Sequence, residues 1–151
     1  MAVADLSRRI YIDTSVWMAL LAQESQASVV KGWMGSELGQ MCVSPWTGTE
    51  LASALAIKQR RGELAQDVMA KLLAQFEAWV TDSLRMLGVD GEDCERAADL
   101  CAHAASGLRA GDALHLAVAL RHGCSHMASL DTVLVKAASD NGLRPIGFIP
   151  D

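Results

Sequence analysis

One short segment near the start of the sequence constrains the fold more than any other. The run Ile10–Ile12 is apolar and rich in residues that favour β-strands, and Asp13 follows it directly. The next residues, Thr14 and Ser15, are typical of the start of a helix. The segment therefore predicts a buried strand, a carboxylate at the C-terminal end of that strand, and a helix over about residues 15–23.

The same alternation of strand and helix continues along the chain. Further strands are expected at 40–44, 84–89, 124–129 and 144–148, and further helices at 27–37, 46–62, 63–80, 93–105, 112–120 and 131–141. Strands that alternate with helices favour a parallel sheet covered by helices. At 151 residues without an evident linker, residues 1–151 are expected to form a single domain. We therefore predict an α/β fold with a central parallel β-sheet of about four to five strands, surrounded by helices.

The composition disfavours several classes of protein. A formal net charge of −5 argues against a broad, sequence-independent grip on the nucleic-acid backbone. No stretch approaches the roughly 18 uninterrupted apolar residues of a spanning helix, and the N-terminus lacks a signal-peptide pattern. We therefore expect a cytoplasmic protein with no membrane partner. The sequence contains no G-x-S-x-G, P-loop or G-x-G-x-x-G motif, which disfavours serine hydrolases, nucleotide kinases and dinucleotide enzymes.

The cysteines give no sign of a metal site. Cys42, Cys94, Cys101 and Cys124 form no CxxC pair and show no zinc-type spacing with histidine. Free cysteine commonly serves as a small buried hydrophobe. We expect all four to be reduced thiols in the core.

Four carboxylates stand where a strand gives way to a helix or in the first turns of a helix: Asp13, Glu50, Asp112 and Asp131. Each has a structural explanation when taken alone. Asp13 and Asp131 are suitable N-caps, and Glu50 fits a capping box with Thr47 in the sequence T-G-T-E. Asp112 is favourable in a first helical turn because of the helix dipole.

Taken together, the four acids point to a shared site. In a parallel α/β domain the strand-to-helix junctions lie at one edge of the sheet, where ligands bind. Two carboxylates about 4 Å apart repel each other by about 4 kcal/mol at an effective dielectric constant near 20, so such a cluster needs a cation. Carboxylate ligands without Cys or His favour Mg²⁺ or Mn²⁺ over zinc. These metals support phosphodiester hydrolysis.

Further polar side chains are expected near the same edge. The hydroxyls of Thr14, Ser15 and Ser129 are suited to orienting water there, although capping also explains them. His115 lies three residues after Asp112 on the same helical face. It is either a hydrogen-bonding support for the acids or a buried histidine whose partners are structural.

Four segments resemble the acidic motifs of PIN-domain proteins. They are Ile12-Asp13-Thr14-Ser15, Glu50 in an early helix, the stretch from Arg109 to His115 (R-A-G-D-A-L-H), and Ala128-Ser129-Leu130-Asp131. The chain is also similar in size to the VapC-type toxin ribonucleases of that family. The resemblance implies a metal-dependent endoribonuclease, the toxin of a type II toxin–antitoxin system, with Mg²⁺ or Mn²⁺ held by Asp13, Glu50, Asp112 and Asp131. It further implies an RNA substrate, a homodimer and a cognate antitoxin whose tail enters the active site.

The sequence departs from the family pattern at one point and leaves two alternatives. Asp131 is not followed by the aromatic residue that many relatives carry nearby, so Glu92 or Asp93 is a substitute to consider for the fourth acid, although a helix-capping role also explains both. One alternative is a receiver-like signalling domain phosphorylated on an acid such as Asp13. Receivers, however, usually pair two acids after the first strand and place a lysine before the last helix, whereas Lys136 falls inside the final expected helix. The other alternative is a catalytically inactive PIN-type scaffold that binds RNA or protein.

Overall fold

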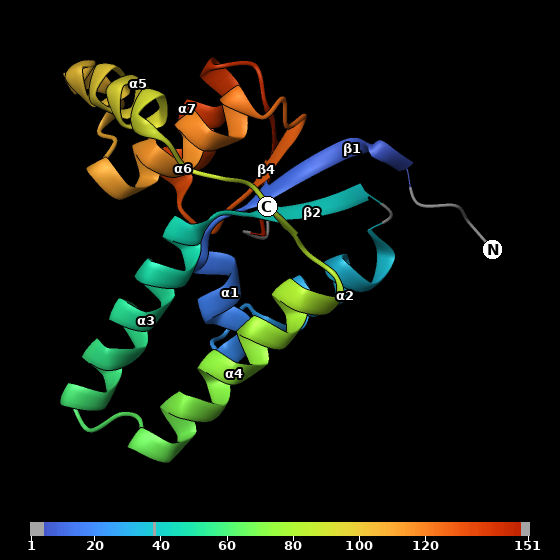
Figure 1. The fold of residues 1–151 in the computed structure, drawn as a ribbon, viewed down its shortest axis with the longest axis vertical. Coiled ribbons are helices and arrows are strands. Elements are labelled where there is room, and N and C mark those ends of the chain that lie inside the picture. Colours follow the sequence, from blue (N-terminus) through green and yellow to red (C-terminus); the bar gives the residue numbers. More distant parts are fainter. Residues whose placement is uncertain (1–4, 38, 149–151) are drawn as a thin grey trace.

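The computed structural model describes residues 5–37 and 39–148, which form a twisted parallel sheet with helices on both faces (Figure 1). The sheet has the strand order β3-β2-β1-β4-β5, and each neighbouring pair is parallel. Its strands are β1 (Asp5–Ile12), β2 (Gly39–Val43), β3 (Arg85–Met86), β4 (His126–Ala128) and β5 (Arg144–Ile146). The predicted α/β class with about four to five parallel strands is confirmed.

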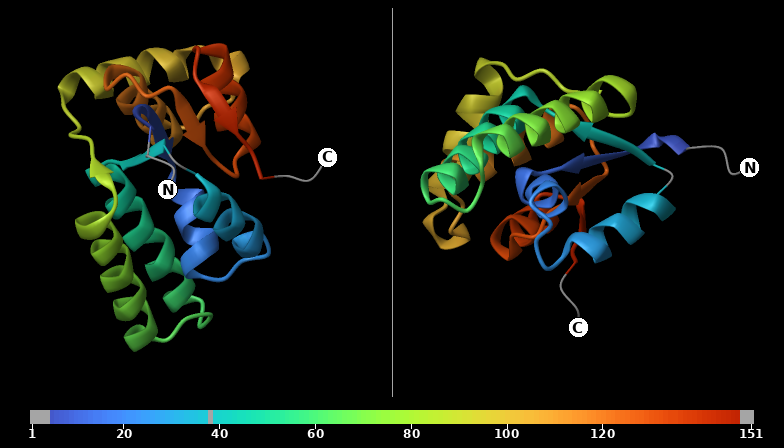
Figure 2. Two further views of the ribbon diagram at one scale, coloured as in Figure 1. Left: turned by 90° about the vertical axis from the view of Figure 1, so that its right-hand side faces the viewer. Right: turned by 90° about the horizontal axis from the view of Figure 1, so that it is seen from below.

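The helices lie in two groups. One group is α1 (Thr14–Leu21), α2 (Ala27–Ser36), α3 (Pro45–Arg60) and α4 (Gln66–Asp82); the other is α5 (Gly91–Ala102), a short 3-10 turn (Ala104–Ser106), α6 (Ala110–Arg121) and α7 (Thr132–Asp140). Figure 2 shows α1–α4 gathered on one side of the sheet and α5–α7 on the other. Each group packs within itself, with α1 against α2 and α3, and α6 against α5 and α7.

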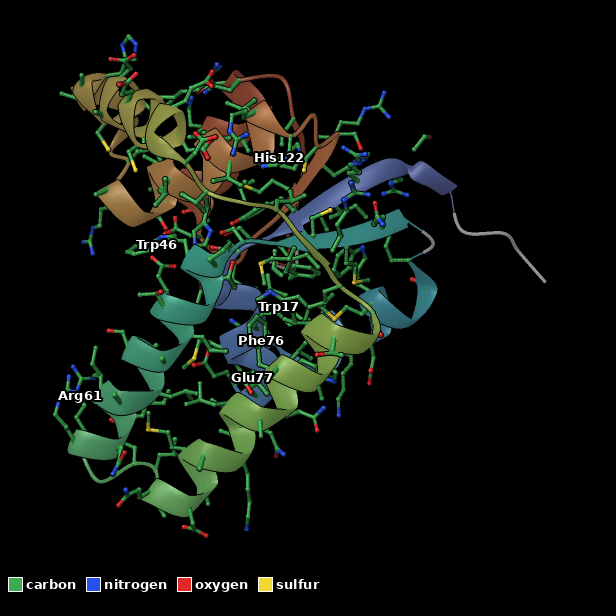
Figure 3. The ribbon with its side chains drawn as sticks, in the orientation of Figure 1. Trp17, Trp46, Arg61, Phe76, Glu77 and His122 are labelled. Atoms are coloured by element: carbon green, nitrogen blue, oxygen red, sulfur yellow. The ribbon has the colours of Figure 1, made fainter. Side chains whose placement is uncertain are left out.

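The central strand β1 contributes side chains to the apolar clusters on both faces of the sheet. Ile10 and Ile12 belong to the apolar cluster of the α1–α4 side, whereas Tyr11 belongs to the cluster of the α6 and α7 side. This is the period of two that a strand requires. On the first side, the Trp17 ring of α1 packs against Phe76 of α4, with the ring centroids 5.6 Å apart (Figure 3). A strand buried on both faces explains why Ile10–Ile12 is an unbroken apolar run.

The strand order creates a switch point at the centre of the sheet. From β1 the chain proceeds to β2 on one side, while the later strand β4 pairs with β1 on the other side. The crevice outside the carboxyl ends of two such strands is where ligands bind in open α/β sheets. In this chain Asp13 follows β1, and Ser129 and Asp131 follow β4. The topology therefore brings two of the four predicted acids to the position where a ligand site is expected.

Three expectations from the sequence were wrong in detail. The strand expected at 84–89 is limited to Arg85–Met86, at the edge of the sheet. The helix expected from residue 63 begins at Gln66, because Gly62 turns the chain with φ +73°. All four cysteines are free, as expected, but Cys94 is exposed because the buried face of α5 carries Asp93 and Ala97 instead.

A search for membrane-spanning segments in the described ranges found no helix with sufficient length and apolar character to cross a bilayer.

Candidate active site

Asp13 stands directly after β1 and occupies the N-cap position of α1, but its side chain makes no capping hydrogen bond. Instead, Ser15 Oγ donates a hydrogen bond to Asp13 Oδ1 (2.6 Å) and accepts one from the backbone N–H of Leu130 (3.0 Å). The Asp13 amide donates to the carbonyl of Ala128 at the end of β4 (3.1 Å). The capping explanation is therefore wrong for Asp13, whose carboxylate is tied to the junction after β4.

The Asp13 carboxylate is held in an unfavourable place for a negative charge. Its residue is only 3% exposed, and this burial raises the pKa of the carboxyl to about 6, with a further contribution from the charge of Asp112. Hydrogen bonds from Ser15 and Ser129 and the presence of His115 lower the pKa but do not outweigh burial. A carboxylate kept in this state gains from a nearby cation.

The junction after β4 supplies Ser129 and Asp131. Asp131 is the N-cap of α7, and its Oδ1 accepts the backbone N–H groups of Val133 (2.8 Å) and Leu134 (3.2 Å). Ser129 Oγ accepts the amide of Asp131 (2.9 Å). The capping role considered for Asp131 is thus confirmed. It engages one carboxylate oxygen and fixes the side chain at the edge of the sheet.

Glu50 lies on α3, and its carboxylate has no capping role. The capping box at the start of α3 is formed by Ser44 and Thr47, so the capping explanation for Glu50 is wrong. Glu50 Oε2 accepts hydrogen bonds from Thr14 Oγ1 and from His115 Nε2, each at 2.7 Å. Burial is the largest single influence on the pKa of Glu50 and raises it, but the hydrogen bond and charge of His115, together with the hydrogen bonds of Thr14 and Trp46, hold that pKa below its usual value.

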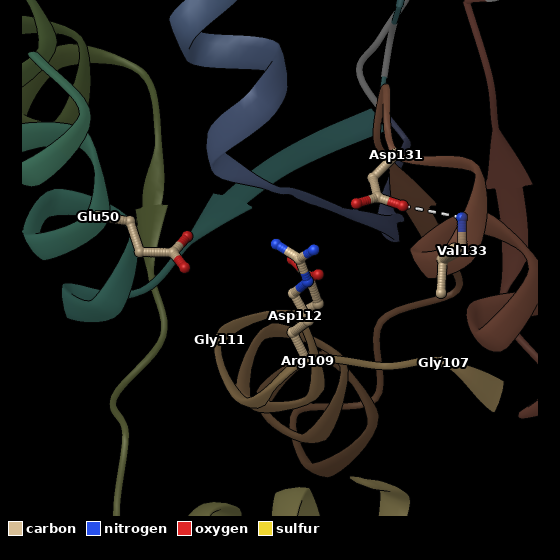
Figure 4. Close-up of a pocket in the computed structure, with 7 residues that line it drawn as sticks. All are labelled: Glu50, Gly107, Arg109, Gly111, Asp112, Asp131 and Val133. Atoms are coloured by element: carbon tan, nitrogen blue, oxygen red, sulfur yellow. Dashed lines mark hydrogen bonds between the residues drawn. The ribbon is translucent and has the colours of Figure 1, made fainter. Parts of the chain in front are cut away.

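Asp112 lies in the first turn of α6, near both Asp131 and Glu50. Its pKa is raised, first by burial and then by the negative charges of Asp131 and Glu50. A hollow of about 630 Å³ is lined by Glu50, Gly107, Arg109, Gly111, Asp112, Asp131 and Val133. In Figure 4 Glu50 and Asp131 reach into it from opposite sides, with Asp112 and Arg109 between them. Asp13 does not line the hollow. It is buried beside it, close enough for the charge of Asp112 to raise the pKa of the Asp13 carboxyl.

The donor set fits a hard divalent cation. Three carboxylates line one hollow, the fourth is buried beside it, and burial and mutual repulsion raise the pKa values of Asp13 and Asp112. In residues 5–37 and 39–148, no three His, Cys, Asp or Glu side chains are arranged closely enough to hold one ion together. Mg²⁺ does not require such a cage, because it commonly retains several waters and uses one or two carboxylates.

Position 111 requires glycine for a steric reason. A Cβ atom added there would collide with Glu50 Oε1, and it would also come within 3.5 Å of the Trp46 ring. The Trp46 indole N–H donates to the Gly111 carbonyl (3.3 Å), which fixes the start of α6 against α3. The approach of α6 to Glu50 therefore depends on the absence of a side chain at this position.

If the site cleaves RNA, as the resemblance of the acidic motifs implies, we expect Gly111→Ala to lower the cleavage rate about 100-fold, because a displacement of about 1 Å at a reacting site can cost this much. The added methyl group must push Glu50 or the start of α6 out of place. Gly48→Ala is the matched control: Gly48 lies on the same helix as Glu50, and a Cβ there meets nothing within 4 Å. Cleavage rates and thermal unfolding of both variants provide the measurement. Equal activity of the two variants would contradict the steric role of Gly111.

Some features of the site were not predicted, and one substitute is excluded. Tyr11 was expected only as an apolar strand residue, yet its hydroxyl lies 2.7 Å from Nδ1 of His115. Asp93, the substitute considered for the fourth acid, is paired with Arg121 at 2.7 Å and completes the capping box of α5. Asp93 is therefore structural. No pattern in the sequence indicates the contact between Tyr11 and His115, because these two residues are 104 positions apart.

The fold and site define a class: a parallel α/β domain with an acid-lined hollow beside the switch point of its sheet. The sequence from residue 10 to residue 140 matches the PIN domain family, and the chain belongs to this family. Because the chain belongs to this family, the receiver-like alternative is excluded. A search of curated proteins gave no significant match.

Several solved structures share the fold. The chain is 21% identical to VapC20 from Mycobacterium tuberculosis, described as a sarcin-ricin loop cleaving toxin, with a TM-score of 0.70 over 89% of this chain and 95% of that one. FitAcB from Neisseria gonorrhoeae is 21% identical, with a TM-score of 0.60 over 90% and 95%. DNA-bound VapBC from Salmonella typhimurium is 16% identical, with a TM-score of 0.64 over 94% and 99%.

Proposed function

We propose that the chain is a Mg²⁺- or Mn²⁺-dependent endoribonuclease whose site consists of Asp13, Glu50, Asp112 and Asp131. The observation that carries this proposal is the shared hollow: acids from separate elements line it although their mutual repulsion is unfavourable. An arrangement of this kind is typical of a site that a cation completes. Membership of the PIN family supports the same conclusion.

The four carboxylates would hold the cation directly or through bound water. When bound, the cation would neutralise negative charge at the reacting phosphodiester and lower the pKa of a water that attacks phosphorus. The supporting residues act on the acids rather than on the substrate. Ser15 holds Asp13 against the β4 junction, and Thr14 donates to Glu50. Ser129 orders the backbone at Asp131.

Arg109 gives the hollow a group of opposite charge. It is the N-cap residue of α6 and lines the hollow beside Asp112. A guanidinium presents several N–H donors in a fixed plane, which matches the oxygens of a phosphodiester. We assign Arg109 to binding the RNA backbone next to the acids. A local contact of this kind is compatible with the net charge of −5.

We further propose that the protein acts as the toxin of a type II toxin–antitoxin pair and forms a homodimer, with a cognate antitoxin as its partner. Structures that share this fold include one described as a toxin and one described as a DNA-bound VapBC. These likenesses support the proposal through the fold, and the resemblance of the acidic motifs supports it through the site. Size-exclusion chromatography with light scattering tests both proposals: on the protein alone it measures the homodimer, and with the product of the neighbouring reading frame it detects a complex with the antitoxin.

The metal requirement is tested by chelation. We expect the purified protein to cut structured RNA in the presence of Mg²⁺ or Mn²⁺, to lose this activity in excess EDTA, and to recover it when the metal is restored. RNA fragments are resolved on denaturing gels, and a preparation of Asp13→Asn controls for contaminating ribonuclease. Full activity in excess chelator would contradict the proposal. RNA binding without metal-dependent cleavage would instead favour the inactive scaffold.

A further inference from the structure

A continuous chain of polar contacts joins the start of α3 to Glu50, further along the same helix, by way of β1 and α6. Ser44 and Thr47 form the capping box of α3, in which Thr47 Oγ1 accepts the Ser44 amide (3.3 Å). Ser44 Oγ lies 2.7 Å from the Tyr11 hydroxyl, which lies 2.7 Å from Nδ1 of His115. Nε2 of His115 lies 2.7 Å from Glu50 Oε2. Three elements distant in sequence are thereby connected to one carboxylate.

This chain is buried in the core. Tyr11, Ser44 and His115 each have 0% exposure. Burying such groups costs free energy unless they are hydrogen-bonded, and the network supplies partners for both nitrogens of the imidazole ring. The other side chains of α6 around His115 are mostly apolar, including Leu116 and Ala119. A histidine that only filled space would not need two short contacts of this kind.

The chemistry of the four groups indicates which of them donates each hydrogen bond. An ionised carboxylate only accepts hydrogen bonds, so Nε2 of His115 carries the proton that Glu50 accepts. In the neutral imidazole Nδ1 then accepts a hydrogen bond from the Tyr11 hydroxyl, 2.7 Å away. Ser44 Oγ in turn donates to the Tyr11 oxygen. Every donor in this assignment has an acceptor.

We propose that His115 is a positioning residue that fixes Glu50 for metal binding, and that Tyr11 holds the imidazole in the tautomer with the proton on Nε2. This inference rests on the proposed function, whose acid site it deepens. The network engages Glu50 Oε2, while Oε1 lies on the Gly111 side, and Glu50 and Gly111 both line the hollow. A carboxylate fixed in this way loses less conformational freedom when it binds a cation.

The test measures Mn²⁺ affinity by isothermal titration calorimetry on four variants of the full chain. Removal of a partner that orients a metal ligand typically costs 10- to 100-fold in metal affinity or activity. We expect Tyr11→Phe and His115→Leu to weaken Mn²⁺ binding about tenfold or more. His115→Gln retains an N–H group directed at Glu50, and we expect it to restore the affinity to within about threefold of wild type. His122→Leu removes a histidine outside the network and should leave affinity unchanged.

A second measurement does not depend on metal or RNA. Nitrogen-15 NMR of the imidazole distinguishes a protonated Nε2 from a protonated Nδ1. We expect the wild type to show the Nε2–H form, and Tyr11→Phe, which removes only one hydroxyl, to change the tautomer or broaden its signals. Urea unfolding of each variant identifies any loss of fold. If His115→Leu does not fold, Tyr11→Phe carries the test.

The outcomes separate this inference from the proposed function. Wild-type Mn²⁺ affinity in Tyr11→Phe, or in a folded His115→Leu, would overturn the positioning role, and so would an Nδ1–H tautomer in the wild type. Absence of Mn²⁺ binding to the wild type would overturn it as well. Mn²⁺ binding that weakens as described, in a protein that cuts no RNA, would leave the inference standing and count against the nuclease proposal alone.

Discussion

RNA cleavage by the Asp13→Asn variant is expected to fall about 1000-fold, while the variant remains folded. A divalent metal contributes several kcal/mol of transition-state stabilisation, and about 4 kcal/mol corresponds to a factor of about 1000 in rate. Asn keeps the shape of the side chain and an oxygen that can accept the Ser15 hydrogen bond, but it removes the charge. The measurement is the initial rate of cleavage under saturating Mg²⁺.

The same variant makes a stability measurement informative. Ionised Asp13 is buried, and its raised pKa shows that the charge is unfavourable in the metal-free fold. Asp13→Asn should therefore be at least as stable as the metal-free wild type at neutral pH. A variant that loses both activity and fold would indicate a structural role for Asp13. Full cleavage activity would remove Asp13 from the site.

The second large effect is a dependence of stability on pH. The pKa of Asp13 is about 6 in the fold, above its value of about 4 in an unfolded chain. For a carboxyl with a raised pKa, the contribution to stability is fully present below pH 4 and is lost as the pH rises through 6. A difference of about two pH units corresponds to about 3 kcal/mol. We therefore expect Asp13 to reduce the unfolding free energy of the metal-free protein by about this amount between pH 4 and pH 8.

The comparison with Asp13→Asn isolates this contribution, since other carboxyls titrate in the same range and Asp93 shifts in the opposite direction. The difference in unfolding free energy between variant and wild type should be near zero at pH 4 and about 3 kcal/mol in favour of the variant at pH 8. Urea unfolding in EDTA at several pH values measures it. Added Mg²⁺ should stabilise the wild type more than the variant at pH 8. A difference that does not change with pH would contradict the raised pKa.

The sequence was sufficient to predict the framework of the fold because that framework rests on local patterns. The run Ile10–Ile12 before Asp13 is apolar on both faces and can be satisfied only by a strand buried between two layers. The expected alternation with helices followed from periodicity. The edge strand β3 was overestimated because an apolar run from 84 to 89 does not reveal that pairing ends after Met86.

The site was harder to predict, since its contacts join distant parts of the chain. The T-G-T-E sequence suggested a capping role for Glu50, but Ser44 before Pro45 provides the cap one turn earlier. Glu50 is left to meet Thr14 and His115, which are 36 and 65 positions away. Strand order, which periodicity does not encode, is what brings Glu50, Asp112 and Asp131 to one hollow and Asp13 beside it. Their assignment as metal ligands stays a prediction.

The attachment of Asp13 and Asp131 to adjoining central strands has a consequence for how a protein of this kind can change. These two acids are fixed by backbone and hydroxyl contacts at the edge of the sheet, whereas Gly107 and Val133, which make no contact with the cation in this proposal, also line the hollow that Asp131 enters. Under the proposed function, we expect substitutions of Gly107 or Val133 to change which RNA segments enter the hollow while the acids stay in place. In that case substrate selectivity and metal binding would depend on different residues, and each could be engineered while the other is kept.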